Sequence, residues 1–216
     1  MGFNMSWIFV EGIDQGALYE ALDLAPTDEI PDESDLGTSY VPLAGATLKS
    51  GWSAVVAKYA LVMDLTEGTN PPRLSRLPAK SRSIICVVLE HAMISYASCW
   101  QDGRHLWQIR HDPNLGDEHL ETFGKLPPEF AGFRDVAVRE QRTKSEGRRQ
   151  GQWGIDYVFD VPLDTAATIT GYKHDRAVDH DFFRNLQTIV PINGNVPIKL
   201  SQPPTWWQVA GSLQYE

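Results

Sequence analysis

Two aromatic, strand-like runs of residues meet at Asp102-Gly103. The first run covers residues 93–100 and the second covers residues 105–111. Because Asp-Gly is favoured in two-residue loops of type I′, this junction predicts a β-hairpin. The register of this loop pairs Trp100 with His105 and Ser98 with Trp107, which places Trp100 and Trp107 on the same face. Both faces contain apolar side chains, so we expect other elements to pack on each side of the hairpin.

The remaining elements follow from the spacing of apolar residues along the chain. The other predicted strands are residues 6–11, 51–62, 84–91 and 152–161. The predicted helices are residues 15–24, 118–123, 129–147 and 162–170. This order predicts an α+β fold, a mainly antiparallel sheet with helices on one face, as an elaboration of the split βαβ or ferredoxin-like arrangement.

The sequence predicts one domain followed by a tail. Residues 1–183 contain the predicted elements and form the expected α+β domain. Residues 184–216 contain repeated prolines, and we expect an irregular C-terminal tail that packs on the body of the protein. Trp206 and Trp207 in this tail are candidates for an anchor, or for the interface of a homo-oligomer in which the chain is a structural subunit.

Composition favours an acidic cytoplasmic protein. The formal net charge is −9, which argues against a nucleic-acid partner and against binding to an anionic membrane. The longest apolar run is residues 84–89, far shorter than the roughly 20 residues of a membrane-spanning helix. Cys86 and Cys99 are the two cysteines, and both lie in strand-like segments, where buried free thiols of a reducing compartment are expected.

An acidic segment gives the first functional hypothesis. Its five acidic residues are Asp28, Glu29, Asp32, Glu33 and Asp35. Their negative potential can steer a basic partner, although a merely solvated loop has the same composition. Together with an aromatic sheet face around Trp100 and Trp107, this segment suggests a non-enzymatic protein-binding protein, of the accessory, inhibitor or bacterial immunity type.

An enzyme is the alternative hypothesis, although the sequence contains no H-E-x-x-H, G-x-S-x-G or phosphate-binding motif. Glu90, His91, His111 and Asp112 lie near the open end of the predicted hairpin. If they converge, they could carry out acid–base or metal-assisted hydrolysis. Adjacent strand residues point to opposite faces, however, and polar residues at strand ends commonly have only structural hydrogen bonds.

A second cluster of ionisable residues follows the helix predicted at 162–170. Its possible metal ligands are His174, Asp175, His180 and Asp181. Imidazole and carboxylate groups suit a divalent ion, but cationic residues here also complement the negative end of the preceding helix. The sequence gives no independent sign of a metal or a cofactor, so we expect none.

Overall fold

The chain is an α+β protein, and the computed structural model describes residues 3–28, 43–48, 50–59, 61–66, 73–145, 154–176 and 187–192. The strands are β1 (Asn4–Glu11), β2 (Leu24–Pro26), β3 (Leu43–Thr47), β4 (Ser53–Lys58), β5 (Arg82–Leu89), β6 (Ile94–Gln101), β7 (Arg104–His111), β8 (Glu121–Gly124) and β9 (Gln187–Pro191). The α-helices are α1 (Gln15–Ala21), α2 (Leu61–Thr66), α3 (Glu129–Ser145) and α4 (Val161–Thr170). Within the described residues, the 3-10 turns are η2 (Arg73–Arg76) and η3 (Pro113–Leu115).

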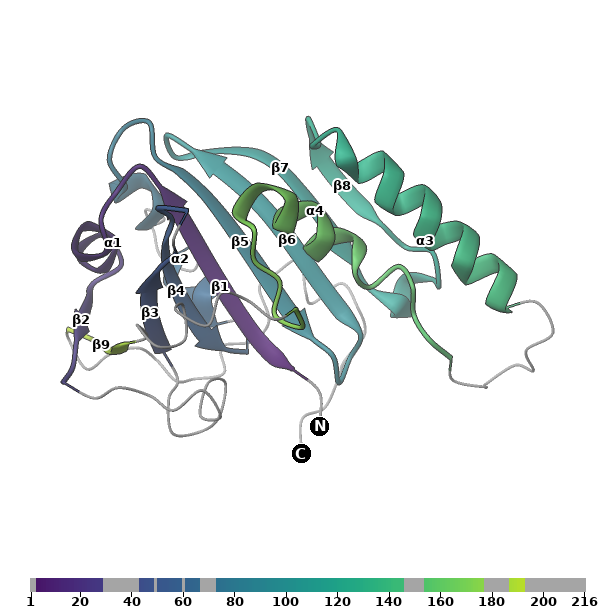
Figure 1. Cartoon of the computed structure of the whole chain (residues 1–216), viewed down its shortest axis with the longest axis horizontal. Coiled ribbons are helices and arrows are strands. Elements are labelled where there is room, and N and C mark those ends of the chain that lie inside the picture. Colours follow the sequence, from purple (N-terminus) through teal and green to yellow (C-terminus); the bar gives the residue numbers. More distant parts are fainter. Residues whose placement is uncertain are drawn as a thin grey trace.

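One nine-stranded sheet in the order β2-β9-β3-β4-β1-β5-β6-β7-β8 organises the protein (Figure 1). Each neighbouring pair of strands is antiparallel, which confirms the predicted antiparallel sheet. Strands β5 to β8 follow one another as a meander. This half of the sheet therefore differs from the split βαβ, ferredoxin-like arrangement that the sequence predicted, in which helices separate the strands.

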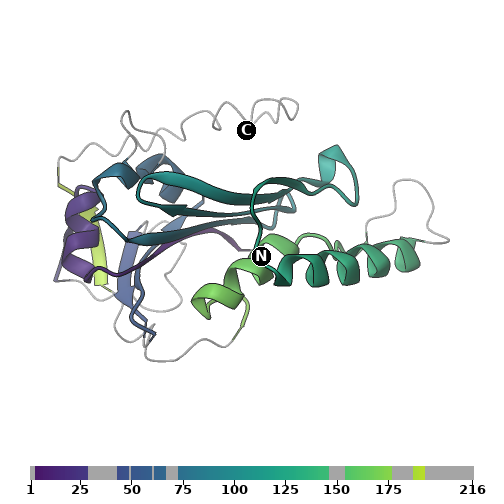
Figure 2. The ribbon, with the colours of Figure 1, turned by 90° about the horizontal axis from the view of Figure 1, so that it is seen from above.

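The central strands are buried on both faces. In β1, Trp7 and Phe9 belong to the core that includes side chains of α3 and α4, whereas Ile8 and Val10 belong to the core that includes side chains of α1 and α2. Figure 2 shows α3 and α4 together on one side of the sheet. The expectation of helices on one face is therefore wrong, because strands without a polar face need cover on both sides.

The hairpin between β6 and β7 forms at Asp102-Gly103, as predicted. These residues have φ angles of 52° and 70°, the positive values that a type I′ turn requires. The two residue pairs next to the turn have the predicted register, but Cys99 then pairs with Trp107. Leu106 is left as an extra residue, which makes a β-bulge in β7.

From Trp107 onward, the bulge turns each side chain of β7 to the face opposite to the predicted one. Trp107 and Ile109 belong to the core beneath α3 and α4, whereas Tyr96 and Trp100 pack toward the core beneath α1 and α2. The prediction that Trp100 and Trp107 share a face is therefore wrong, because a shift of one residue turns every following side chain to the other face.

Two local segments differ from their predicted structure. Part of the helix predicted at 118–123 is strand β8, since Thr122 and Phe123 are typical strand residues and pair with β7. The strand predicted at 152–161 is absent from its described residues, 154–161. There, Asp156 Oδ1 accepts hydrogen bonds from two backbone N–H groups, which forms a local turn before α4.

The C-terminal segment predicted as irregular contains strand β9, which pairs with β2 and β3. The domain boundary at residue 183 stays a prediction, because residues 193–216, including Trp206 and Trp207, lie outside the described residues. Cys86 and Cys99 are buried free thiols, as predicted. Among the helices that the structure describes, none combines the length and the apolar character needed to cross a bilayer.

Gly124 is required where β8 approaches the bulge. Its φ is +74°, and a Cβ there would lie 1.9 Å from the carbonyl oxygen of Leu106.

We expect Gly124→Ala to lower the free energy of unfolding by about 1–3 kcal/mol in urea titrations, because the backbone must move. The matched control is Gly132→Ala, at an open helical position, which should change stability by less than about 1 kcal/mol or increase it. Equal effects of the two substitutions would contradict this explanation.

Candidate functional site

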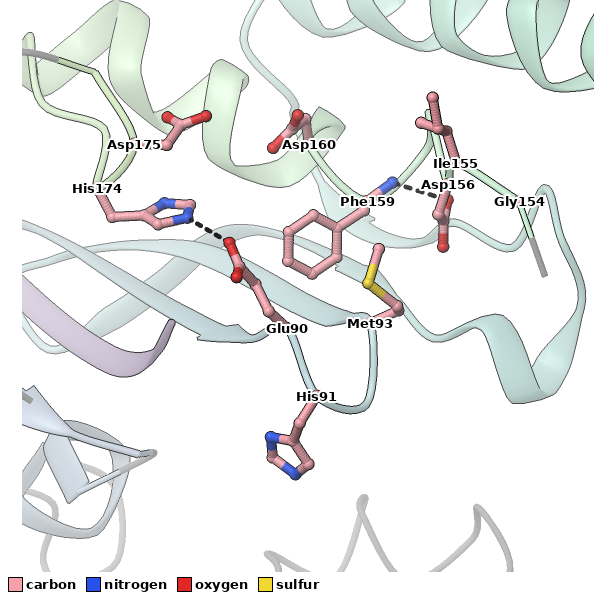
Figure 3. Close-up of a pocket in the computed structure, with 10 residues that line it drawn as sticks. All are labelled: Glu90, His91, Met93, Gly154, Ile155, Asp156, Phe159, Asp160, His174 and Asp175. Carbon is pink, nitrogen blue, oxygen red and sulfur yellow. Dashed lines mark hydrogen bonds and ion pairs between the residues drawn. The ribbon is translucent and has the colours of Figure 1, made fainter. Parts of the chain in front are cut away.

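An open pocket of about 420 Å³ lies between the β5–β6 turn and the two ends of α4. Small-ligand sites have volumes of about 300–1,000 Å³. The residues that line it are Glu90, His91, Met93, Gly154, Ile155, Asp156, Phe159, Asp160, His174 and Asp175 (Figure 3). They come from three segments of the chain, so the pocket depends on the packing of α4 against the sheet.

Short-range backbone contacts place two of these segments. Met93 has a φ of 53° and donates its N–H to the carbonyl of Glu90, which closes the turn after β5. Gly171 is left-handed, with a φ of 76°, and ends α4 directly after residue 170, where the helix predicted at 162–170 also ends. The chain then turns back toward the β5–β6 turn, and this reversal places His174 beside Glu90.

Glu90 and His174 form the central contact of the pocket. His174 Nε2 lies 3.4 Å from Glu90 Oε1, and the His174 side chain is only 1% exposed. Burial lowers the pKa of His174 below its ordinary value, although Asp175 and Glu90 oppose this shift. The ring is therefore neutral at pH 7. With its single N–H directed at Glu90, its Nδ1 is left as a hydrogen-bond acceptor.

Lys173 links the carboxylates at the other side of the pocket. Its Nζ lies 2.9 Å from Asp160, 3.2 Å from Asp164 and 3.5 Å from Asp175. Burial by itself lowers the pKa of Lys173, but the hydrogen bond and charge of Asp160, together with the other two carboxylates, raise it above its ordinary value. Lys173 is therefore charged and neutralises part of this acidic group.

His111 holds Asp156, one of the residues that line the pocket, in place. Its Nδ1 lies 2.7 Å from the carbonyl oxygen of His119, and its Nε2 lies 2.8 Å from Asp156 Oδ2. A carbonyl oxygen can only accept a hydrogen bond, so Nδ1 donates to His119, and the fully buried ring pairs with Asp156 through Nε2. The pair fastens the segment before α4 to β7.

Asp112 has a separate structural role. It forms a buried ion pair of 2.7 Å with Arg110, and its other oxygen accepts a hydrogen bond from the backbone N–H of Asn114. Its own N–H donates to His119 Nδ1. Burial, followed by the charges of Arg110 and His111, lowers the pKa of His119, which keeps that nitrogen available as an acceptor.

The four residues proposed as an acid–base cluster are thus placed apart. Glu90 contacts His174, whereas His111 and Asp112 are engaged in the structural contacts above. His91 hydrogen-bonds Asn4 Oδ1 and lies on the opposite side of the β5–β6 turn from Glu90 (Figure 3). The contact that the structure does supply, between Glu90 and His174, combines one residue from each of the two predicted clusters.

The proposed metal cluster is only partly described. His174 and Asp175 line the pocket, while His180 and Asp181 lie outside the described residues. Within residues that the structure does describe, no group of three or more histidine, cysteine, aspartate or glutamate side chains could hold a metal ion.

The predicted partner-binding residues also separate. Asp28 is exposed, and Glu29, Asp32, Glu33 and Asp35 lie outside the described residues. Trp107 is buried in the core, whereas Trp100 is part of a stack at the end of the sheet. There the ring centroids of Trp100 and His105 are 4.5 Å apart, and those of His105 and Phe123 are 4.8 Å apart.

Sequence reasoning missed Asp156, Asp160 and Phe123. Asp160 precedes Val161-Pro162, a pattern typical of a helix start, and this signal could have drawn attention to the loop before α4. Phe123 could not be found, because its place beside His105 depends on the bulge. No protein-family model, curated protein or solved structure matches this chain.

Asp156 should be essential for stability, since it pairs with His111 and also accepts hydrogen bonds from two backbone N–H groups. We expect Asp156→Ala to reduce the free energy of unfolding by about 3–5 kcal/mol, because it leaves the buried His111 Nε2 and two backbone N–H groups without their partner. Urea unfolding followed by tryptophan fluorescence measures the loss. The control is Asp135→Ala, which removes an exposed pair with Arg134 and should have little effect. A similarly small effect of Asp156→Ala would show that the His111 contact contributes little.

The buried His174 should make stability depend on pH. Its folded pKa lies below the ordinary value of 6.5, so the unfolded chain binds a proton that the folded chain excludes as pH falls below about 6.5. Its contribution is therefore present above pH 6.5 and is lost toward lower pH, by at most about 1.4 kcal/mol per pH unit. In His174→Gln, the loss of stability between pH 7.5 and 5.5 should be smaller than in the parent protein. An unchanged loss would rule out His174 as a source of it.

Proposed function

We propose that the chain is a non-enzymatic protein-binding protein, of the accessory or inhibitor type, that works in the cytoplasm and takes an extended segment of a basic partner at the β8 end of its sheet. The observation that carries this proposal is the aromatic stack of Trp100, His105 and Phe123 beside an exposed edge strand. We call these three residues with Leu106 the aromatic end of the sheet. A bacterial immunity protein is one specific form of this proposal.

The aromatic end combines two features of peptide-binding surfaces. All four residues of β8 are exposed, and β8 is the last strand of the sheet, so its outer edge is suited to pairing with an added strand. Within β8, Phe123 is 53% exposed, and Leu106 of the neighbouring strand β7 is 39% exposed. Aromatic side chains supply large contact areas at such interfaces, and backbone pairing adds affinity.

Charge favours a basic partner. The chain has a net charge of −9, and the acidic segment at residues 28–35 contains five acidic residues. Such a charge increases the rate of association with a basic protein, whereas contacts at the aromatic end would slow dissociation. The buried thiols of Cys86 and Cys99 agree with a reducing compartment.

A library of linear twelve-residue peptides displayed on phage tests this proposal directly. Selection on the folded protein should enrich peptides with alternating apolar residues and several lysine or arginine residues. Their affinity should fall at least about tenfold in Phe123→Ser, the loss of about 1.4 kcal/mol expected for removing an aromatic anchor. It should also fall as salt concentration rises.

The matched control is Val190→Ser, which removes an exposed apolar side chain of β9 near the other end of the sheet. This variant should bind the selected peptides as the parent protein does. Peptides that bind equally well to Phe123→Ser, or a selection that enriches no peptide, would contradict the proposal.

A further inference from the structure

The pocket beside α4 has walls of two different kinds. Glu90, Asp160 and Asp175 supply carboxylates, and Met93 and Phe159 supply apolar surface. Figure 3 shows the Phe159 ring between these groups, with Glu90 to one side and Met93 to the other. A ligand that fits both walls has a polar head with hydrogen-bond donors and a short apolar tail.

The pocket has more negative than positive charge. Four carboxylates line it, those of Glu90, Asp156, Asp160 and Asp175. Two basic side chains contact them: Lys173 beside Asp160 and Asp175, and His111 beside Asp156. Even with His111 counted as a cation, the difference, 4 − 2, leaves two negative charges. Within the described residues, the ion-pair partner of Glu90 is His174, whose ring is neutral, so the charge of Glu90 is not compensated.

An orphan acceptor in the pocket wall points independently to a ligand. The side chain of His174 is 99% buried, and its Nδ1 has no hydrogen-bond partner within the described part of the chain. Figure 3 shows the ring extending toward the space between Asp175, Asp160 and Glu90. A buried acceptor without a partner destabilises the folded protein. A ligand with an N–H group would remove this cost.

We propose that this pocket binds a small organic cation, an alkylammonium group whose tail lies on Met93 and Phe159. An ammonium has three N–H donors and no acceptor, which suits a wall of carboxylates with a histidine acceptor. The face of Phe159 adds a cation–π contribution near the charged head. The described residues lack a ligand set for a metal ion, which favours an organic cation over a divalent metal. This site is separate from the aromatic end of the sheet.

Titration of the ¹⁵N-labelled full chain with n-butylammonium, followed by amide chemical shifts, tests the proposal. We expect saturable shifts confined to residues 90–93, 154–160 and 173–175. At the same ionic strength, n-butanol and butyrate should bind at least tenfold more weakly, because they lack the positive charge. A Mg²⁺ or Zn²⁺ titration is run in parallel.

Two variants with the same change in net charge make the test specific. Glu90→Gln should weaken n-butylammonium binding at least tenfold, whereas Glu20→Gln, on the exposed face of α1, should leave it unchanged. His174→Phe should also weaken binding and provides a second variant if Glu90→Gln fails to fold. Phe123→Ser should have no effect, which separates this proposal from the protein-binding proposal.

Three outcomes would overturn the proposal. They are shifts that do not saturate, equal binding by Glu90→Gln and the parent protein, and tighter saturable binding of a divalent metal at the same residues.

Discussion

Burial of the central strands on both faces is the constraint on which the rest of the structure depends. Six consecutive residues of β1 and seven of β5 are buried, so neither strand has a face that can meet water. Helices must therefore cover both sides of the sheet, and α1 and α2 take one side while α3 and α4 take the other. The protein therefore has two hydrophobic cores, one on each face of the sheet, whereas a sheet with one solvent-exposed face has a single core.

A sheet of nine strands is wider than these helices can cover. Strand β7 packs against α4 on one face of the sheet. Strand β8 is exposed along its length. The bulge at Leu106 turns Trp107 into the core and leaves Trp100 and His105 to stack with Phe123 at the uncovered end. The proposed binding surface and the pocket beside α4 therefore both lie where the helices stop covering the sheet.

Local sequence signals predicted the elements that local interactions determine. Asp102-Gly103 fixed the hairpin turn, Asp14 caps α1 by accepting the N–H of Ala17, and Gly171 ends α4. Local signals did not predict the features that depend on contacts between residues far apart in the sequence. The bulge at Leu106 and strand β8 depend on pairing across the sheet. Glu90 and His174 are 84 residues apart, and their contact exists only because α4 packs on β5 and β6.

Residue-resolved amide hydrogen exchange of the native protein tests the central claim, that the sheet is buried at β1 and β5 and open at β8. The amides of Ile8 and Val87 should exchange only through global unfolding, while those of Thr122 and Phe123 should exchange through much smaller local openings. Protection of β8 equal to that of β1 would mean that the end of the sheet is covered, and it would contradict both the two-layer account and the binding surface built on it.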